Sequence, residues 1–257
     1  MQNIDVVFLL QPLVVISLAS GLVIYWHYRR SFRGVILAYS LVAYSVAIAL
    51  KYAVQIPTVS SVTNYFGTHS VGIGVYYGIQ TVVFEVGLAY LICWYGVTIR
   101  KLGPKDAEAF GLGLGFWENA VLLGLTSLIN LLAYYAILST NTPTAQTLFN
   151  QLNKSSPALF EPPSQAFKAV VAGVVERISS ILIHFSWGYL CMIAAFFRKR
   201  RYFAIALPMG FVDFLVPFAS SLGTALFEAI VFVLSILCLA VALLSTKGIQ
   251  KKQEVPA

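Results

Sequence analysis

Seven apolar segments dominate this chain of 257 residues, and each is long enough to cross a lipid bilayer. The hydrocarbon core of a bilayer is about 30 Å thick, and an α-helix crosses it with about 20 residues. None of the segments shows the two-residue alternation of an outer-membrane strand. The sequence therefore predicts an all-α membrane protein with seven transmembrane helices, forming one polytopic domain over residues 1–257. The predicted spans lie near 5–26, 34–54, 71–99, 107–138, 165–197, 202–221 and 223–245.

The composition excludes an ordinary soluble domain, because 59% of the residues are hydrophobic and only 11% are charged. We therefore expect a multi-pass protein of the cell membrane, with the lipid bilayer as its first partner. Two longer connections, 55–70 and 139–164, are rich in Ser, Thr, Asn and Pro, so we expect loops there.

The basic residues predict the orientation of the spans. Thirteen of the 17 Lys and Arg residues fall in four short stretches, 29–33, 100–105, 198–201 and 247–252. With seven spans these stretches share one side, and basic loops face the cytoplasm. We therefore expect the N-terminus outside and the C-terminus inside. The net charge of +7 then reflects topology, and no nucleic-acid partner is expected.

Four ionisable side chains are predicted to share one level near the middle of the membrane. Counting 1.5 Å per helical residue from the cytoplasmic ends of their spans places Glu85, Glu118, His184 and Asp213 roughly 18–23 Å deep. Three carboxyl groups crowded in a medium of low dielectric cannot all stay ionised, so one must hold a proton or share a bound cation. Ionisable groups at this depth are functional candidates by default. The alternative is that each acid is protonated and only hydrogen-bonds between helices.

A second set of charged residues falls nearer the outer interface by the same arithmetic. Lys51, Glu176 and Glu228 lie roughly 27–33 Å from the cytoplasmic ends, with Arg177 beside Glu176. Two acids balance two bases there, so we interpret this set as a structural ion-pair layer that holds three helices together.

The glycine run GLGLGFWEN, 111–119, lies inside a span with no strand before it, so it is not a dinucleotide-binding fingerprint. Gly111 and Gly115 are four residues apart and would let another helix approach closely, just before Glu118.

The order of these motifs resembles the YhfC family of glutamic intramembrane peptidases, relatives of the CAAX prenyl endopeptidase group. The resemblance covers nearly the whole chain. It rests on VVFEVGLAYL (82–91), FGLGLGFWENAVLLG (110–124), ERISSILIHFSWGYL (176–190), FRKRRYF (197–203) and ALPMGFVDFLVPF (206–218).

The resemblance implies that Glu85, Glu118, His184 and Asp213 correspond to the family's catalytic group, which activates a water for cleavage of a peptide bond in the membrane. If the chain is active, a divalent metal such as zinc is implied, with His184 and Glu85 as its candidate ligands. The spacing of these residues is not a recognised ligand motif of the HExxH kind.

Four positions depart from the family pattern. Val86 stands where the family has a second Glu, Ala89 where it has Arg, and Leu114 and Met209 where it has His. These changes remove a general base, a cation and two imidazoles, whereas hydrolysis needs an activated nucleophile and stabilisation of the developing charge.

The leading hypothesis is therefore a degenerate, protease-like pseudoenzyme that binds a membrane helix, a lipid or a partner subunit in a polar mid-membrane cavity. An active intramembrane metallo- or glutamic endopeptidase acting on a membrane-protein or peptide substrate is the first alternative. A transport or translocation component, with carboxylates lining a path, is the second.

Overall fold

The computed structural model describes residues 4–100, 102–140 and 142–253. Within these residues, seven helical stretches are long and apolar enough to cross a membrane, so the predicted all-α architecture with seven spans is confirmed. The stretches are Val6–Arg30, Val35–Phe66, Val71–Ile99, Pro104–Leu138, Pro163–Phe197, Arg200–Leu222 and Thr224–Gly248.

The spans are built from α-helices interrupted by short 3-10 and π-helical turns, which carry the label η. In chain order they are η1 (Val6–Leu9), α1 (Leu10–Arg30), α2 (Val35–Phe66), α3 (Val71–Gln80), η2 (Thr81–Val86), α4 (Gly87–Arg100), η3 (Pro104–Asp106), α5 (Ala107–Phe116), η4 (Trp117–Leu125), α6 (Thr126–Leu138), α7 (Pro143–Ser155), η5 (Pro157–Phe160), α8 (Pro163–Phe197), α9 (Arg200–Gly210), η6 (Phe211–Phe218), α10 (Ala219–Leu222) and α11 (Thr224–Gln253).

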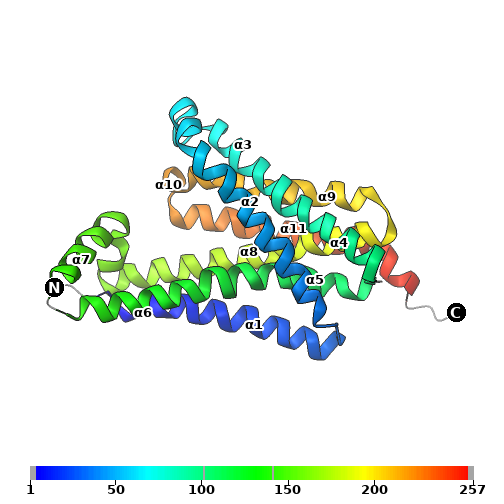
Figure 1. Ribbon diagram of the computed structural model, residues 1–257, viewed down its shortest axis with the longest axis horizontal. Helices are drawn as coiled ribbons and strands as arrows, with labels where there is room; N and C mark the ends of the chain where they lie inside the picture. Colours follow the sequence, from blue (N-terminus) through cyan, green and yellow to red (C-terminus); the bar gives the residue numbers. More distant parts are fainter. Residues whose placement is uncertain (1–3, 101, 141, 254–257) are drawn as a thin grey trace.

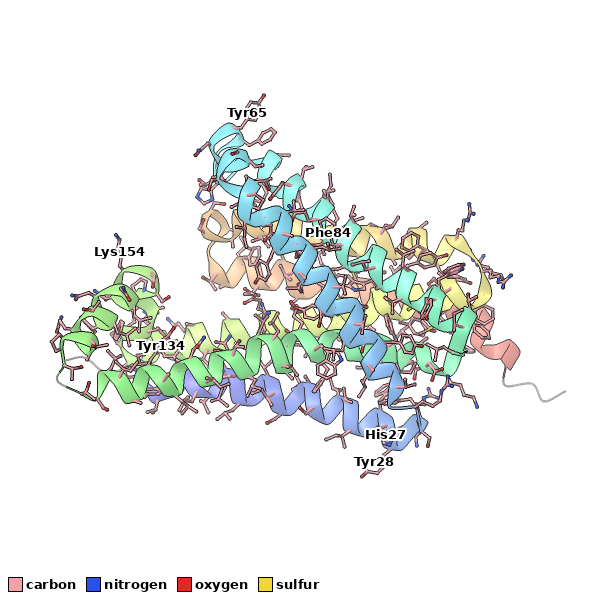
Figure 2. The ribbon with its side chains drawn as sticks, in the orientation of Figure 1. His27, Tyr28, Tyr65, Phe84, Tyr134 and Lys154 are labelled. Atoms are coloured by element: carbon pink, nitrogen blue, oxygen red, sulfur yellow. The ribbon has the colours of Figure 1, made fainter. Side chains whose placement is uncertain are left out.

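Helix α8 is the central element of the fold. It packs against α5, α11, α9, α4 and α1, and Figure 1 shows α2 crossing the bundle obliquely. In its most apolar stretch of 18 residues 78% are buried, whereas in the other described spans the corresponding share is 28% or less. The other spans bury fewer of their residues and leave many apolar side chains exposed, as helices facing lipid do. Tyr28 and Tyr65 point away from opposite ends of the bundle (Figure 2), where tyrosines mark the membrane interfaces.

Glycines bring α5 and α8 into backbone contact. A Cβ atom on Gly111 would lie 2.5 Å from the carbonyl oxygen of Phe185, and one on Gly188 would lie 2.8 Å from the Cα of Gly111. Side chains at either position would force the helices apart. The close approach predicted from the glycine run is therefore confirmed, and it brings the chain that carries Glu118 against α8.

The loop predicted for 55–70 is wrong for most of its length. Helix α2 continues to Phe66 although Pro57 lies inside it. A proline cannot donate the helical hydrogen bond, so Pro57 costs α2 one bond without ending it. The Thr58 hydroxyl donates to the carbonyl of Val54 at 2.5 Å and lies 2.6 Å from the Tyr76 hydroxyl. The contact with Tyr76 ties the extension of α2 to α3.

The loop predicted for 139–164 is also wrong, because it contains α7. Thr142 caps this helix by accepting a hydrogen bond from the backbone of Ala145. Leu152 of α7 is buried in an apolar cluster with Phe8 of η1, Leu138 of α6 and Ala166 of α8. The loop-like composition led to the wrong prediction. The segment is an amphipathic helix that buries its apolar face against the ends of the spans rather than in a core of its own.

The orientation of the spans stays a prediction, and α7 provides its test. Gln151 is exposed on α7, on the side that the basic residues place outside the cell. A cysteine introduced by Gln151→Cys is expected to react with a membrane-impermeant maleimide in intact cells. A cysteine in place of Arg33, on the opposite side, is expected to react only after permeabilisation. The reverse pattern would show that the N-terminus is cytoplasmic.

Candidate active site

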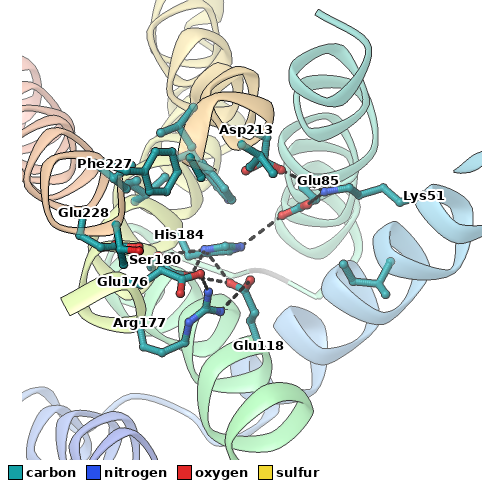
Figure 3. Close-up of a pocket in the computed structure, with 18 of the residues that line it drawn as sticks. Lys51, Glu85, Glu118, Glu176, Arg177, Ser180, His184, Asp213, Phe227 and Glu228 are labelled. Carbon is teal, nitrogen blue, oxygen red and sulfur yellow. Dashed lines mark hydrogen bonds and ion pairs between the residues drawn. The ribbon is translucent and has the colours of Figure 1, made fainter. Parts of the chain in front are cut away.

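Three of the four predicted mid-membrane acids and bases are carried by turns that are not α-helical. Glu85 lies in the π-helical turn η2, Glu118 in the π-helical turn η4, and Asp213 in the 3-10 turn η6. A π-helical turn widens the helix locally and is frequent at functional sites. His184 lies on the unbroken helix α8, between these turns (Figure 3).

His184 joins two of the carboxyl groups. Its Nε2 lies 3.2 Å from Glu85 Oε2, and its Nδ1 lies 3.0 Å from Glu118 Oε2 and 2.9 Å from the carbonyl oxygen of Ser180. The imidazole is buried, with the Trp187 ring centroid 4.3 Å from its own. The structure therefore brings Glu85, Glu118 and His184 into contact, whereas Asp213 joins them only through Lys51. Their chemical roles remain predictions.

Lys51 belongs to this inner group and not to the predicted outer layer. Its Nζ lies 2.5 Å from Glu85 Oε1, 3.2 Å from Asp213 Oδ2 and 2.9 Å from Thr81 Oγ1. The Thr81 hydroxyl also donates to Asp213. Counting residues along each helix misplaced the amine. The oblique course of α2 and the long lysine side chain both move the amine away from the depth that the residue count predicts.

The remaining residues of the predicted outer layer do not form a balanced set. Arg177 donates to Glu176 and approaches Glu118, with 4.0 Å between Nη1 and Oε1. Glu228 is buried, and its Oε2 has no hydrogen-bond partner among the described residues. The interpretation of Lys51, Glu176, Arg177 and Glu228 as one ion-pair layer is therefore wrong in its pairing, although Arg177 and Glu176 do pair.

Three polar side chains complete the network but were not singled out from the sequence. Ser180 donates to Glu118 Oε2 at 2.7 Å, and Asn119 donates to Ser180 Oγ at 3.0 Å. Thr81 supports Lys51 and Asp213 as described above. Ser180 could have been found from its spacing, since it lies one helical turn before His184 and faces the same side. Asn119 and Thr81 carry no comparable signal.

The network lines a cavity of about 450 Å³ between α2, α8, η6 and α11. Figure 3 shows Glu228 and Phe227 of α11 facing the same space as His184. Apolar side chains complete the wall. The lining includes Ile48, Lys51, Glu85, Glu118, Glu176, Arg177, Ser180, Ile183, His184, Trp187, Val212, Asp213, Val216, Ala219, Ser220, Thr224, Phe227, Glu228 and Val231.

A family model described as YhfC intramembrane metalloprotease matches residues 14–242, which is most of the chain. The chain belongs to this family. It is thus a multi-pass, intramembrane-protease-like membrane protein. No curated protein and no solved structure matches it in the corresponding comparisons. The membership agrees with the resemblance drawn from the motifs, which covers the same length.

The YhfC name implies a metal, but the donor atoms of this member do not fit one. Lys51 Nζ stands between Glu85 and Asp213, where a bound cation would need their oxygens. Both nitrogens of His184 face hydrogen-bond acceptors, whereas a metal ligand needs one nitrogen free. Within the described part of the chain, no group of three or more His, Cys, Asp or Glu side chains is arranged to hold a metal ion.

The four positions that the motif resemblance marks as departures lie in one apolar cluster beside the cavity. Val86, Ala89, Leu114 and Met209 are buried together with Ile183 and Trp187, which line the cavity wall. Gly188 packs against Leu114 and Gly210 against Val86, since a Cβ on either glycine would come within 2.8 Å of that side chain. A closely packed apolar layer thus occupies these four positions.

Proposed function

We propose that this YhfC member is a pseudoenzyme that has lost proteolysis and uses its mid-membrane cavity to bind a membrane-embedded ligand, whether a helix, a lipid or a partner subunit. The position of the Lys51 ammonium carries the proposal. It holds Glu85 and Asp213 together by an ion pair on each side, at 2.5 and 3.2 Å. The chain's own amine thus fills the place between the two acids that a bound cation would need.

The surrounding groups support the loss of hydrolysis. A general base must reach an attacking water, and the developing oxyanion must meet a free donor. Here Glu85 is held by Lys51 and His184, and Glu118 by His184 and Ser180. Arg177 is paired with Glu176. The polar groups mostly satisfy one another, which suits a structural network better than a site that activates water.

The cavity supports a binding role. Its volume of about 450 Å³ lies within the range of about 300–1,000 Å³ typical of ligand sites. Its wall combines apolar side chains with a few polar groups, as binding pockets do. Val216, Ser220 and Thr224 line it and are exposed on the outside of the protein, so a ligand can reach it without unfolding the bundle.

Purified protein tests the loss of proteolysis. The wild type is expected to carry no stoichiometric divalent metal by elemental analysis, and to leave a panel of membrane-spanning peptides uncleaved, as Glu85→Gln does. Equal background in both proteins supports the pseudoenzyme. Cleavage by the wild type that Glu85→Gln abolishes would overturn it and establish the active endopeptidase.

Photocrosslinking in native membranes tests the binding role. A photoreactive amino acid at Val216, which is exposed and lines the cavity, is expected to form a discrete adduct with a lipid or polypeptide. The same group at Leu226, which is exposed but does not line the cavity, serves as the control. Equal, diffuse labelling at both positions would contradict a specific ligand.

A further inference from the structure

We infer that the cavity ligand is a membrane-embedded polypeptide segment that brings a basic side chain, Lys or Arg, to Glu228. This inference rests on the proposed binding function and names its ligand class. Three observations carry it, namely a buried acid without a partner, an excess of carboxyl groups, and an apolar wall around both.

Glu228 is the acid without a partner. Its side chain is 8% exposed, and its Oε2 makes no hydrogen bond among the described residues. It lines the cavity from α11, together with Glu176 and Ser180 of α8 (Figure 3). A carboxyl group in a membrane protein is costly to bury unless a donor meets it. Among the described residues no cation lies within salt-bridge distance of Glu228. Arg177 is near enough to attract it but is paired with Glu176, and every other acid of the cavity has a cationic partner within that distance.

The charge balance points to a cation. Five carboxyl groups line the cavity, whereas only Lys51, Arg177 and His184 can carry positive charge. All three are already held by Glu85, Glu118, Glu176 or Asp213. An incoming ammonium or guanidinium would meet an unpaired acceptor in a region of low dielectric, where such an interaction is strongest.

The wall of the cavity favours a polypeptide as the bearer of that cation. Ile48, Val212, Val231 and Phe227 make much of the lining apolar, which suits the aliphatic stem of a lysine or arginine side chain. A lipid with an amine head group would also bring a phosphate among the excess carboxyl groups, where like charges repel. A basic side chain on an apolar helix brings the cation alone.

The test uses the full-length protein in detergent and two fluorescent, apolar helical peptides that differ at one central position, Lys or Met. The Lys peptide is expected to bind the wild type at least tenfold more tightly than the Met peptide. In Glu228→Gln this preference is expected to disappear while binding of the Met peptide is unchanged. Glu228→Gln should fold as the wild type does, because it leaves no protein cation unpaired, and a melting curve checks this. Glu161→Gln, an exposed acid away from the cavity, is the matched control and should keep the preference.

The outcomes separate the inference from the proposed function. If both peptides bind the wild type equally, the role of Glu228 is overturned while the binding function stands. If phosphatidylethanolamine displaces the Met peptide and the protein binds the Lys peptide no more tightly than the Met peptide, the cavity binds a lipid and the inference is overturned. If neither the peptides nor phosphatidylethanolamine binds, the proposed binding function fails with it.

Discussion

Replacing Lys51 by alanine is expected to lower the free energy of unfolding by about 3–5 kcal/mol, the usual cost of removing one partner of a buried ion pair. Lys51 is the ammonium between Glu85 and Asp213, with Thr81 as its third contact. Without it, two carboxyl groups face each other across a space that no protein cation fills. The loss can be measured by titrating the protein from mild detergent into sodium dodecyl sulfate.

Two controls show whether the cost comes from unpaired charge. Lys168→Ala removes an exposed lysine from α8 and should change stability little. Adding Glu85→Gln and Asp213→Asn to Lys51→Ala removes the charges that the amine balanced, so the triple variant should be more stable than Lys51→Ala alone. If the single and triple variants are equally stable, the ion pairs are not what holds this region together.

The same variant tests whether the ammonium stands in for a bound cation. Once Lys51 is removed, the oxygens of Glu85 and Asp213 are free to approach a divalent ion, which prefers ligand distances of about 2.0–2.2 Å. Zinc is therefore expected to raise the melting temperature of Lys51→Ala and to leave that of the wild type unchanged. If zinc raises the melting temperature of the wild type equally, the conclusion that the wild-type site does not fit a metal is wrong.

Much of this arrangement was predictable from the sequence. In a membrane protein the length of an apolar run predicts a span, and an ionisable residue within that run predicts a polar contact between helices. The seven spans followed from the length of the apolar runs. The meeting of Glu85, Glu118 and His184 followed from their common depth, because the depth of a residue in every span can be counted from the same face of the bilayer. The contact of Gly111 with α8 followed from its small size.

The partners of these groups were not predictable in the same way. Depth counting fixes the position of a Cα along a span but ignores helix tilt and side-chain reach, so Lys51 was assigned to the wrong level. The π-helical turns that carry Glu85 and Glu118 depend on how neighbouring helices pack, and no residue type marks them. Helix α7 was missed because its polar, proline-containing composition drew attention away from Ala145, Leu148, Phe149 and Leu152, whose spacing is that of an amphipathic helix.

The second large loss of stability is expected for Leu114→His, in the apolar layer beside the cavity. Leu114 is 2% exposed and packs against Gly188 of α8. The change removes a buried apolar side chain and buries an imidazole with no partner in the cluster. The loss of apolar burial and the unsatisfied polar group together predict a destabilisation of about 3–5 kcal/mol, measured by the same detergent titration. Leu114→Met keeps the volume and the apolar character, and should cost less than about 1.5 kcal/mol.

The packing of the apolar layer also predicts the effect of placing polar residues at its four positions. Val86, Ala89, Leu114 and Met209 are packed in one cluster, so each polar replacement alone lacks a partner and should destabilise the protein without restoring activity. The combination of Val86→Glu, Ala89→Arg, Leu114→His and Met209→His supplies partners to one another, and groups that act as a unit are recovered only together. While Lys51 is in place, we therefore expect peptide cleavage from the fourfold variant but from none of the single variants. A single change such as Met209→His that restored cleavage would show that the apolar layer is not what prevents catalysis.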